Sequence, residues 1–376
     1  MDHNDRSAKR TPTGALARYA LYGGILLAGA WLAAPTVHAD FERSFTLAGD
    51  SLELIDLIGE VEVVGYSGDD FQVTVTVRGD DADEERIDFD LEQGGAARLH
   101  IRYPLDEERD YVYPRMGRGS RTTFSYDSFL GRSSGLLREL LGRGERIRIA
   151  GSGSGLEVWA DVRLQVPSGK PATVRIAVGE IHARDVAAYL LLDTASGPIS
   201  AVQVEGNLTA DTGSGAVDVA RVRGMVSVDT GSGAVDVEDC RGEEVRVDTG
   251  SGRVEVSDVD CERLDINTGS GSVRARAIAT DSARLDTGSG SITLELERMG
   301  AGRFELDAGS GSITLVLPAD ASARVRADTG SGGIDLNVRD ARQKRLRSDR
   351  ADFTLGDGDA RVSLDTGTGG IRIRQR

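Results

Sequence analysis

The chain has 376 residues and carries 61 Asp and Glu against 45 Lys and Arg, for a formal net charge of −16. This acidity argues against nucleic acid as a partner, because phosphate binding needs an excess of Lys and Arg. The chain has four His and two Cys. No His/Cys metal cluster, Ser-His-Asp set, P-loop or dinucleotide-binding glycine motif can be assembled from the sequence.

Residues 1–39 are predicted to be a secretory signal peptide. Lys9 and Arg10 precede an apolar run over 20–34, and the small-x-small sequence at 37–39 offers a cleavage site. The run is short for a membrane span, and an uncleaved anchor is the alternative. No later stretch is apolar enough to cross a bilayer. We therefore expect an exported mature chain, residues 40–376, without a transmembrane span, in the periplasm or at the cell surface.

Residues 40–102 are predicted to form an N-terminal β-strand region. Within it, 58–63 read Ile-Gly-Glu-Val-Glu-Val, so apolar and polar residues alternate. This alternation indicates a strand with one buried face. A similar pattern returns at 178–181, which predicts that the two segments are distant copies of one repeat. His100, in this region, and His182 are expected to be ordinary surface residues.

Residues 103–150 are predicted to be an aromatic- and arginine-rich insertion. Between Tyr111 and Arg148 the chain has eight Arg against three acids, a local charge of +5. Tyr and Arg are enriched at binding hot spots and at cation–π contacts. The candidate partner-binding residues are Tyr111, Tyr113, Arg115, Arg118, Arg121, Phe124 and Tyr126. A flexible insertion between strands is the alternative interpretation.

Residues 151–376 are predicted to form a β-solenoid, because they contain nine copies of the turn Asp/Asn-Thr-Gly-Ser-Gly or a close variant. The copies begin at Asp193, Asp211, Asp229, Asp248, Asn267, Asp286, Asp307, Asp328 and Asp365. The steps are 18, 18, 19, 19, 19, 21, 21 and 37 residues, and the last predicts a degenerate copy inside it. A fixed period near 20 residues is typical of a solenoid, in which each repeat packs on its neighbours.

Valine-rich alternating segments flank each turn, so each repeat is predicted to be strand, tight turn, strand and loop. Turn glycines such as Gly250 are expected to adopt positive φ. The predicted fold is all-β: a parallel β-solenoid, similar to a β-helix, of about 18–21 residues per coil with one irregular insertion. A sandwich of antiparallel hairpins is the alternative. At the end of the chain, Arg372, Arg374 and Arg376 are expected to protect an edge strand.

Stacking in register would place the turn aspartates in one row. Carboxylates at about 5 Å repel by roughly 0.8 kcal/mol per pair in water, so either turn amides neutralise them or cations bind along the row. We expect no cofactor, and calcium along the row is the alternative. Asp-Thr-Gly-Ser also carries the catalytic aspartate of pepsin-like proteases. Those enzymes need two aspartates that face each other and share a proton, which a row does not provide.

Cys240 and Cys261 lie in the loops of successive coils, 8 residues before Asp248 and 6 before Asn267. Stacking brings these loops side by side, so the two residues are a candidate disulfide in an exported chain. The offset of two residues leaves a pair of buried free thiols as the alternative.

The Gly-x-Val-x-Val strands and the serial Asp-Thr-Gly-Ser-Gly turns, behind a signal-like N-terminus, resemble the bacterial putative-adhesin family of uncharacterised β-strand repeat proteins. That family is related to the head domains of putative autotransporter adhesins. The resemblance covers roughly 40–102 and 151–376 and is strongest from Asp193 on. It implies an exported, non-catalytic β-solenoid and carries over no active-site residues. The chain departs from the family in its 103–150 insertion, and it lacks the C-terminal translocator of a true autotransporter, which favours the periplasm.

The sequence therefore predicts a non-enzymatic, adhesin-like binding module of the cell envelope, with an envelope glycan or an envelope protein as its partner. A structural or regulatory envelope protein that works through protein partners is the first alternative. A polysaccharide-active enzyme is the second, because some β-helices are lyases or hydrolases. Acids abound in this chain, but none stands out from the repeat.

Overall fold

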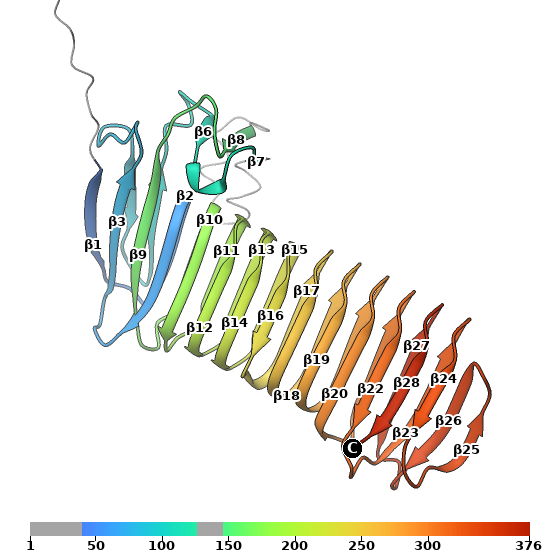
Figure 1. The fold of residues 1–376 in the computed structure, drawn as a ribbon. Helices are drawn as coiled ribbons and strands as arrows, with labels where there is room; N and C mark the ends of the chain where they lie inside the picture. The colour runs from blue at the N-terminus through green and yellow to red at the C-terminus, as the bar shows by residue number, and fades with distance from the viewer. Residues whose placement is uncertain (1–39, 126–145) are drawn as a thin grey trace, which may run out of the picture. The chain divides into compact units, whose positions relative to one another are not determined.

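The computed structural model describes residues 40–125 and 146–376, so the predicted signal peptide over 1–39 and the candidate contact residue Tyr126 lie outside the described residues. The described residues are almost entirely β-structure (Figure 1). They form a 25-stranded sheet, a 3-stranded sheet and a single 3₁₀ turn, η1 (Pro114–Met116). None of these residues forms a helix that is long and apolar enough to span a membrane.

One coil shows how the sequence makes the repeat. In β13 (Leu208–Ser214), Leu208, Ala210 and Thr212 are buried while Asp211 is exposed. After the turn, Val217 and further apolar residues of β14 (Val217–Arg223) are buried again. Each coil thus gives one strand to each of two faces whose apolar sides meet in the core. We call the face that carries the turn aspartates the aspartate face and the other the second face.

Equivalent strands of neighbouring coils pair in parallel and in register, which confirms the predicted β-solenoid (Figure 1). The distant repeats also stack, since Gly59 pairs with Gly179 and Val61 with Ile181. The strands of the coils are β2 (Ser51–Tyr66), β10 (Ala172–Val186), β11 (Leu190–Ser196), β12 (Ile199–Glu205), β13, β14, β15 (Val226–Ser232), β16 (Val235–Glu238), β17 (Arg241–Thr249), β18 (Val254–Thr268), β19 (Val273–Thr287), β20 (Ile292–Met299), β21 (Arg303–Ala308), β22 (Ile313–Leu317), β23 (Ala323–Thr329), β24 (Ile334–Asn337), β27 (Ala360–Thr366) and β28 (Ile371–Gln375).

The turn glycines are required by the close approach of neighbouring coils. A Cβ added at Gly250 would lie 2.5 Å from the carbonyl oxygen of Gly231, and one at Gly252 would lie 1.7 Å from that of Gly233. Neither Gly250 nor Gly252 belongs to the glycines with positive φ, so the expectation of positive φ at Gly250 is wrong. The fifth turn position is the tighter one, because a side chain there would overlap the backbone of the preceding coil.

The left-handed backbone lies at another place in the coil, within or directly after the strand on the second face. In six successive coils one non-glycine residue has positive φ there, and these residues are Asp185, Gln203, Arg221, Asp239, Asp258 and Ala277. Left-handed geometry costs an L-residue about 1–2 kcal/mol, and these six coils repeat it. None of the six residues is a glycine, so the sequence pattern did not reveal this feature.

The N-terminal end of the stack is closed by antiparallel strands. β5 (Ala96–Arg102) and β9 (Trp159–Pro167) lie parallel to the two halves of β2. Next to them, β4 (Asp88–Glu92) pairs antiparallel with β5, and β3 (Phe71–Arg78) pairs antiparallel with β9 and with β1 (Phe41–Leu47). Within 40–102, β2 alone forms a coil, while the remaining strands cover the end of the core.

At the C-terminal end the coils do not stack in chain order. The last coil, β27 and β28, lies between the coil of β21 and β22 and that of β23 and β24. The 37-residue step contains an antiparallel pair, β25 (Arg342–Leu346) and β26 (Arg350–Leu355), instead of the predicted degenerate copy. β26 also pairs antiparallel with β23. Arg372 and Arg374 thus lie on the internal strand β28, and the expectation that they protect an edge is wrong.

Candidate functional site

The outer surface of the aspartate face carries one polar turn residue per coil, and we call this row the aspartate ladder. In the order of the stack it consists of Asp193, Asp211, Asp229, Asp248, Asn267, Asp286, Asp307, Asp365 and Asp328. Parallel pairing in register places like residues beside like residues. The predicted row of aspartates is therefore confirmed, with Asn267 as its uncharged member.

Arginines neutralise both ends of the aspartate ladder. Arg175 of β10 pairs in register with Asp193, and its Nη1 lies 3.5 Å from Oδ2 of that residue. At the other end, Nε of Arg326 donates a hydrogen bond of 2.8 Å to Asp328, and Arg350 of β26 donates a second one. The end carboxylates thus have cationic partners. Four interior members stand between two other carboxylates, and these are Asp211, Asp229, Asp307 and Asp365.

Burial and mutual repulsion raise pKa values within the ladder. The pKa of Asp211 rises to about 6, because the neighbouring coils partly remove water from this exposed residue, which disfavours its charged form, and because the charges of Asp193 and Asp229 repel it. Burial is also the main reason why the pKa values of Asp193 and Asp229 rise. For Asp328 burial acts in the same direction, but hydrogen bonds from its two arginines bring the pKa below the usual value.

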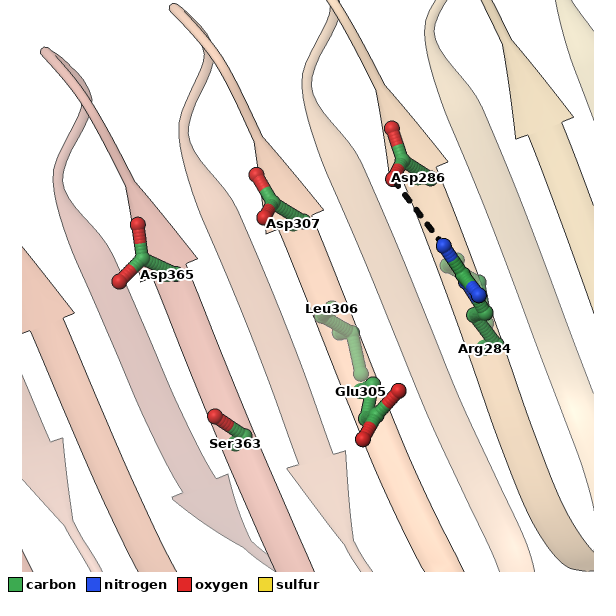
Figure 2. A pocket seen from close by; sticks show the side chains of 8 residues that line it. Arg284, Asp286, Glu305, Leu306, Asp307, Ser363 and Asp365 are labelled. Atoms are coloured by element: carbon green, nitrogen blue, oxygen red, sulfur yellow. Dashed lines mark ion pairs between the residues drawn. The ribbon is translucent and has the colours of Figure 1, made fainter.

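A shallow hollow opens on the ladder across β19, β21 and β27 (Figure 2). Its volume is about 160 Å³ and its lining residues are Arg284, Leu285, Asp286, Glu305, Leu306, Asp307, Ser363 and Asp365. The short side chain of Ser363 leaves space beside the longer Glu305. Arg284 lies 3.9 Å from Asp286, so the side of the hollow formed by Asp307 and Asp365 keeps the unbalanced negative charge.

The ladder offers a regular row of hydrogen-bond acceptors. Figure 2 shows Asp286, Asp307 and Asp365 at equivalent places on three adjacent strands. Among the residues that the structure describes, no group of three or more His, Cys, Asp or Glu is arranged to hold a metal ion. The carboxylates stand side by side, in contrast to the facing pair that an aspartic protease needs.

Two of the predicted contact residues, Tyr111 and Tyr113, belong to the core. They are 1% and 3% exposed. The ring of Tyr111 meets that of Tyr103 edge to face at a centroid distance of 5.7 Å, and Tyr113 packs on Trp159, also at 5.7 Å. Burial of such large apolar surfaces stabilises the fold, so these tyrosines anchor the insertion. The interpretation of Tyr111 and Tyr113 as partner contacts is corrected accordingly.

Arg115 fastens the described part of the insertion to the coils. This part contains the 3-stranded sheet of β6 (Asp110–Val112), β8 (Arg146–Ala150) and β7 (Arg121–Ser125). One guanidinium nitrogen of Arg115 lies 2.9 Å from Glu60 and another lies 2.9 Å from Asp161. The charge of Arg115 is therefore balanced within the protein, and its two ion pairs hold the insertion against the coils.

The remaining predicted contact residues differ in exposure. Arg118 and Arg121 are exposed, while Phe124 is partly buried against the core cluster. Of the predicted set within the described residues, Arg115, Arg118 and Arg121 are open to solvent, and Arg115 is held by its ion pairs with Glu60 and Asp161.

Cys240 and Cys261 are both buried free thiols. The register explains why no disulfide joins them, since the residue beside Cys261 in the preceding coil is Gly242. Burial raises the pKa of Cys240 to about 11, and a protonated thiol is a poor nucleophile. The structure thus shows the second of the two alternatives that the sequence left open.

Two buried polar groups were missed by the sequence reasoning. His100 is 3% exposed, contrary to the expected surface position, and burial lowers its pKa to about 4. Asp56 is 1% exposed. Its Oδ1 accepts hydrogen bonds from the Leu57 amide and the Tyr103 hydroxyl, while Oδ2 has no partner. Burial raises the pKa of Asp56 well above its usual value. The signal was an aspartate between two apolar residues inside a strand, where strict alternation fails.

Comparisons with known proteins identify a family. A family model described as Toastrack DUF4097 matches residues 173–374. No curated protein matches the chain. Among solved structures, a putative cell adhesion protein from Clostridium sporogenes is 11% identical with a TM-score of 0.19, over 90% of this chain and 100% of that chain. A putative adhesin from Bacteroides fragilis is 9% identical with a TM-score of 0.32, over 90% of this chain and 97% of that chain.

Proposed function

This chain belongs to the Toastrack DUF4097 family, and from that premise we propose that it is an exported, non-catalytic binding module of the cell envelope. The family assignment agrees with the resemblance drawn from the strands and turns. The observation that carries the proposal is the outer surface of the coils, on which polar side chains of one kind recur in register on successive strands. Such a surface suits a partner that is itself extended.

The small volume of the hollow on the aspartate ladder supports a non-catalytic role. The hollow on the aspartate ladder has a volume of about 160 Å³, whereas small-molecule sites usually enclose about 300–1,000 Å³. The hollow on the ladder is thus smaller than a usual small-molecule site. The polar rows of the coils instead offer many weak contacts along a line, and such contacts add up over a long partner.

The insertion supplies a second part of the proposed contact surface. Arg118 and Arg121 are exposed, and they project from a segment that Arg115, Tyr111 and Tyr113 hold against the coils. Exposed arginines on a rigid support lose little entropy when they bind. We propose an envelope glycan or an envelope protein as the partner, in keeping with the signal-like N-terminus of the sequence.

The proposal is tested by binding of the mature protein, residues 40–376, to isolated envelope fractions and to a glycan panel. The variant Arg118→Ala/Arg121→Ala is compared with Arg241→Ala/Arg263→Ala, which removes the same charge from exposed positions on the coils. Substitution is preferable to deletion of the insertion, because deletion would remove the buried Tyr111 and Tyr113 from the core. We expect the first variant to lose about tenfold in affinity and the control to keep it.

The outcomes separate the hypotheses. Saturable binding to a glycan supports an adhesin-like module, while co-purification with one envelope protein supports the structural or regulatory alternative. Equal binding by both variants would move the contact surface away from the insertion and onto the coils. Steady turnover of any polysaccharide by the purified protein would contradict a non-catalytic role.

A further inference from the structure

A row of arginines crosses the C-terminal strands of the aspartate face. Arg303 of β21, Arg361 of β27 and Arg324 of β23 occupy one register position on three adjacent strands. The same position continues through Thr354 of β26 to Arg342 of β25. We call Arg303, Arg361, Arg324 and Arg342 the arginine row. Neighbouring strands are about 4.8 Å apart, so the first three members span about 10 Å at the backbone.

The arginine row is exposed and poorly neutralised. All four of its members are exposed. Arg303 contacts Glu305 of its own strand at 3.2 Å, but within the described residues no ion pair is found for Arg324, Arg342 or Arg361. Most other arginines of the coils do have acidic partners, as Arg274 does with Glu255 at 2.9 Å. Like charges directly opposite each other destabilise a sheet, so the row has a cost that folding alone does not explain.

A hollow of about 300 Å³ lies on this row. It is lined by Arg303, Glu305, Arg324, Arg326, Arg361, Val362 and Ser363. Two features shape it. Two positions along the strands from the arginine row, Ser363 is short where its register neighbours are Glu305 and Arg326. Arg324 lies so close to Gly358 that a Cβ there would be 3.0 Å from the Cγ of Arg324. Packing against Gly358 restricts the stem of Arg324 and so holds its guanidinium at the hollow.

We propose that the arginine row binds an acidic polysaccharide through the carboxylate groups of successive sugar residues. This inference rests on the proposed function and names its ligand class and a second contact surface. A guanidinium matches a carboxylate with two parallel hydrogen bonds. Arg324 and Arg361 have this capacity free, and Arg303 and Arg326 border the same hollow. In a chain of net charge −16, the row is a local site of opposite sign to which an acidic polymer is attracted.

The surroundings favour a linear polymer over a membrane surface. Four positions along β21, β27 and β23 from the row, the same strands carry Asp307, Asp365 and Asp328 of the aspartate ladder. A flat anionic bilayer would have to approach these carboxylates together with the arginines. A single polysaccharide chain can follow the arginines across the strands and stay clear of the ladder.

The test measures binding of polygalacturonate to the mature protein at low and high salt, with neutral dextran as the control polymer. Arg324→Ala/Arg361→Ala is compared with Arg241→Ala/Arg263→Ala, which makes the same change in charge on other coils. We expect polygalacturonate to bind at low salt, the first variant to lose at least about tenfold in affinity and the second to lose less than about twofold. Binding should weaken as salt rises, because exposed charges are screened.

Folding is checked by thermal melting of both variants. Removal of like charges that face each other should leave the Tm unchanged or raise it. With such a Tm the Arg324→Ala/Arg361→Ala variant is folded, and its loss of binding is due to the missing arginines. The inference is overturned if polygalacturonate does not bind, or if both variants bind it equally. It is also overturned if vesicles containing phosphatidylglycerol bind through these arginines while polygalacturonate does not.

Envelope fractions tested alongside separate this inference from the proposed function. Binding to the fractions without binding to polygalacturonate overturns the role of the arginine row and leaves the envelope-binding function standing. Failure of both contradicts the proposed function as well.

Discussion

The threonine of each turn is a polar residue that the fold buries. Thr212, Thr287 and Thr366 are each 1% exposed. Their hydroxyls donate to the carbonyl oxygen of the last turn glycine of the coil next to them, over 2.9 Å from Thr287 to Gly271 and 2.6 Å from Thr366 to Gly311. The hydroxyl therefore links one coil to the next at the turn. This explains why the turn contains threonine.

Replacement of Thr287 by Val should lower the free energy of unfolding by about 1–3 kcal/mol, because the Gly271 carbonyl and the Gly290 amide lose their partner. Thr249 provides a matched control, since its buried Oγ1 has no hydrogen-bond partner. Thr249→Val should be neutral or stabilising. Urea denaturation of both variants checks the pair. Equal losses would show that the hydroxyl bond to the neighbouring coil contributes nothing measurable.

At the scale of the element, the aspartate ladder stores repulsion between neighbouring strands. Its interior members are held side by side by backbone pairing, so they cannot move apart as surface carboxylates do. The folded state responds by binding protons more tightly, most clearly at Asp211, whose pKa rises to about 6. Asn267 interrupts the ladder and donates a hydrogen bond of 3.2 Å to Asp248, which turns one repulsive contact into an attractive one.

Replacement of Asp211 by Asn would place the uncharged residue type of position 267 at a second position of the ladder. Because the pKa of Asp211 is higher in the folded state than in the unfolded chain, the folded state loses stability as pH rises from about 4 to about 6. Asp211→Asn should therefore raise the Tm by about 1–3 °C at pH 7, an amount kept small by solvent screening, and leave it unchanged at pH 4. Thermal melts across this pH range check the prediction, with Asp88→Asn on the exposed strand β4 as the charge control. A gain that persists at pH 4 would refute the assignment.

At the scale of the whole stack, the order of the coils departs from the order of the chain. β27 and β28 lie between two coils that precede them in sequence. The strands before them, β23 and β24, are held in the stack through this last coil. Both ends of the stack finish in antiparallel strands, which change the direction of pairing and so end the parallel repeat. Such ends limit further strand addition at an edge.

Truncation after Asp359 should be far more damaging than the loss of a terminal coil. It removes β27 and β28, and with them the strands that join β21 and β22 to β23 and β24. We expect a lower Tm, aggregation through the exposed strands, and rapid proteolysis over residues 318–359. Limited proteolysis followed by mass spectrometry checks this. Continued protection of β23 and β26 in the truncated protein would mean that the coils stack in chain order.

The sequence by itself determined the repeat, the alternation of buried and exposed residues, and the row of aspartates. These features depend on local periodicity and on the rule that parallel strands in register place like residues together. It also indicated the family, because the turns and strands that carry the resemblance are local in the chain.

The tertiary structure alone decided where the non-repeating residues go. Tyrosines such as Tyr111 and Tyr113 are common at contact sites, but here they are buried in the core, where they stabilise the fold. The left-handed backbone, the position of the last coil and the row from Arg303 to Arg342 join residues that are distant in sequence or lack a marker such as glycine. Periodicity describes how a coil resembles its neighbour, whereas the ends, the insertion and the order of the coils depend on which strand edges remain free to pair.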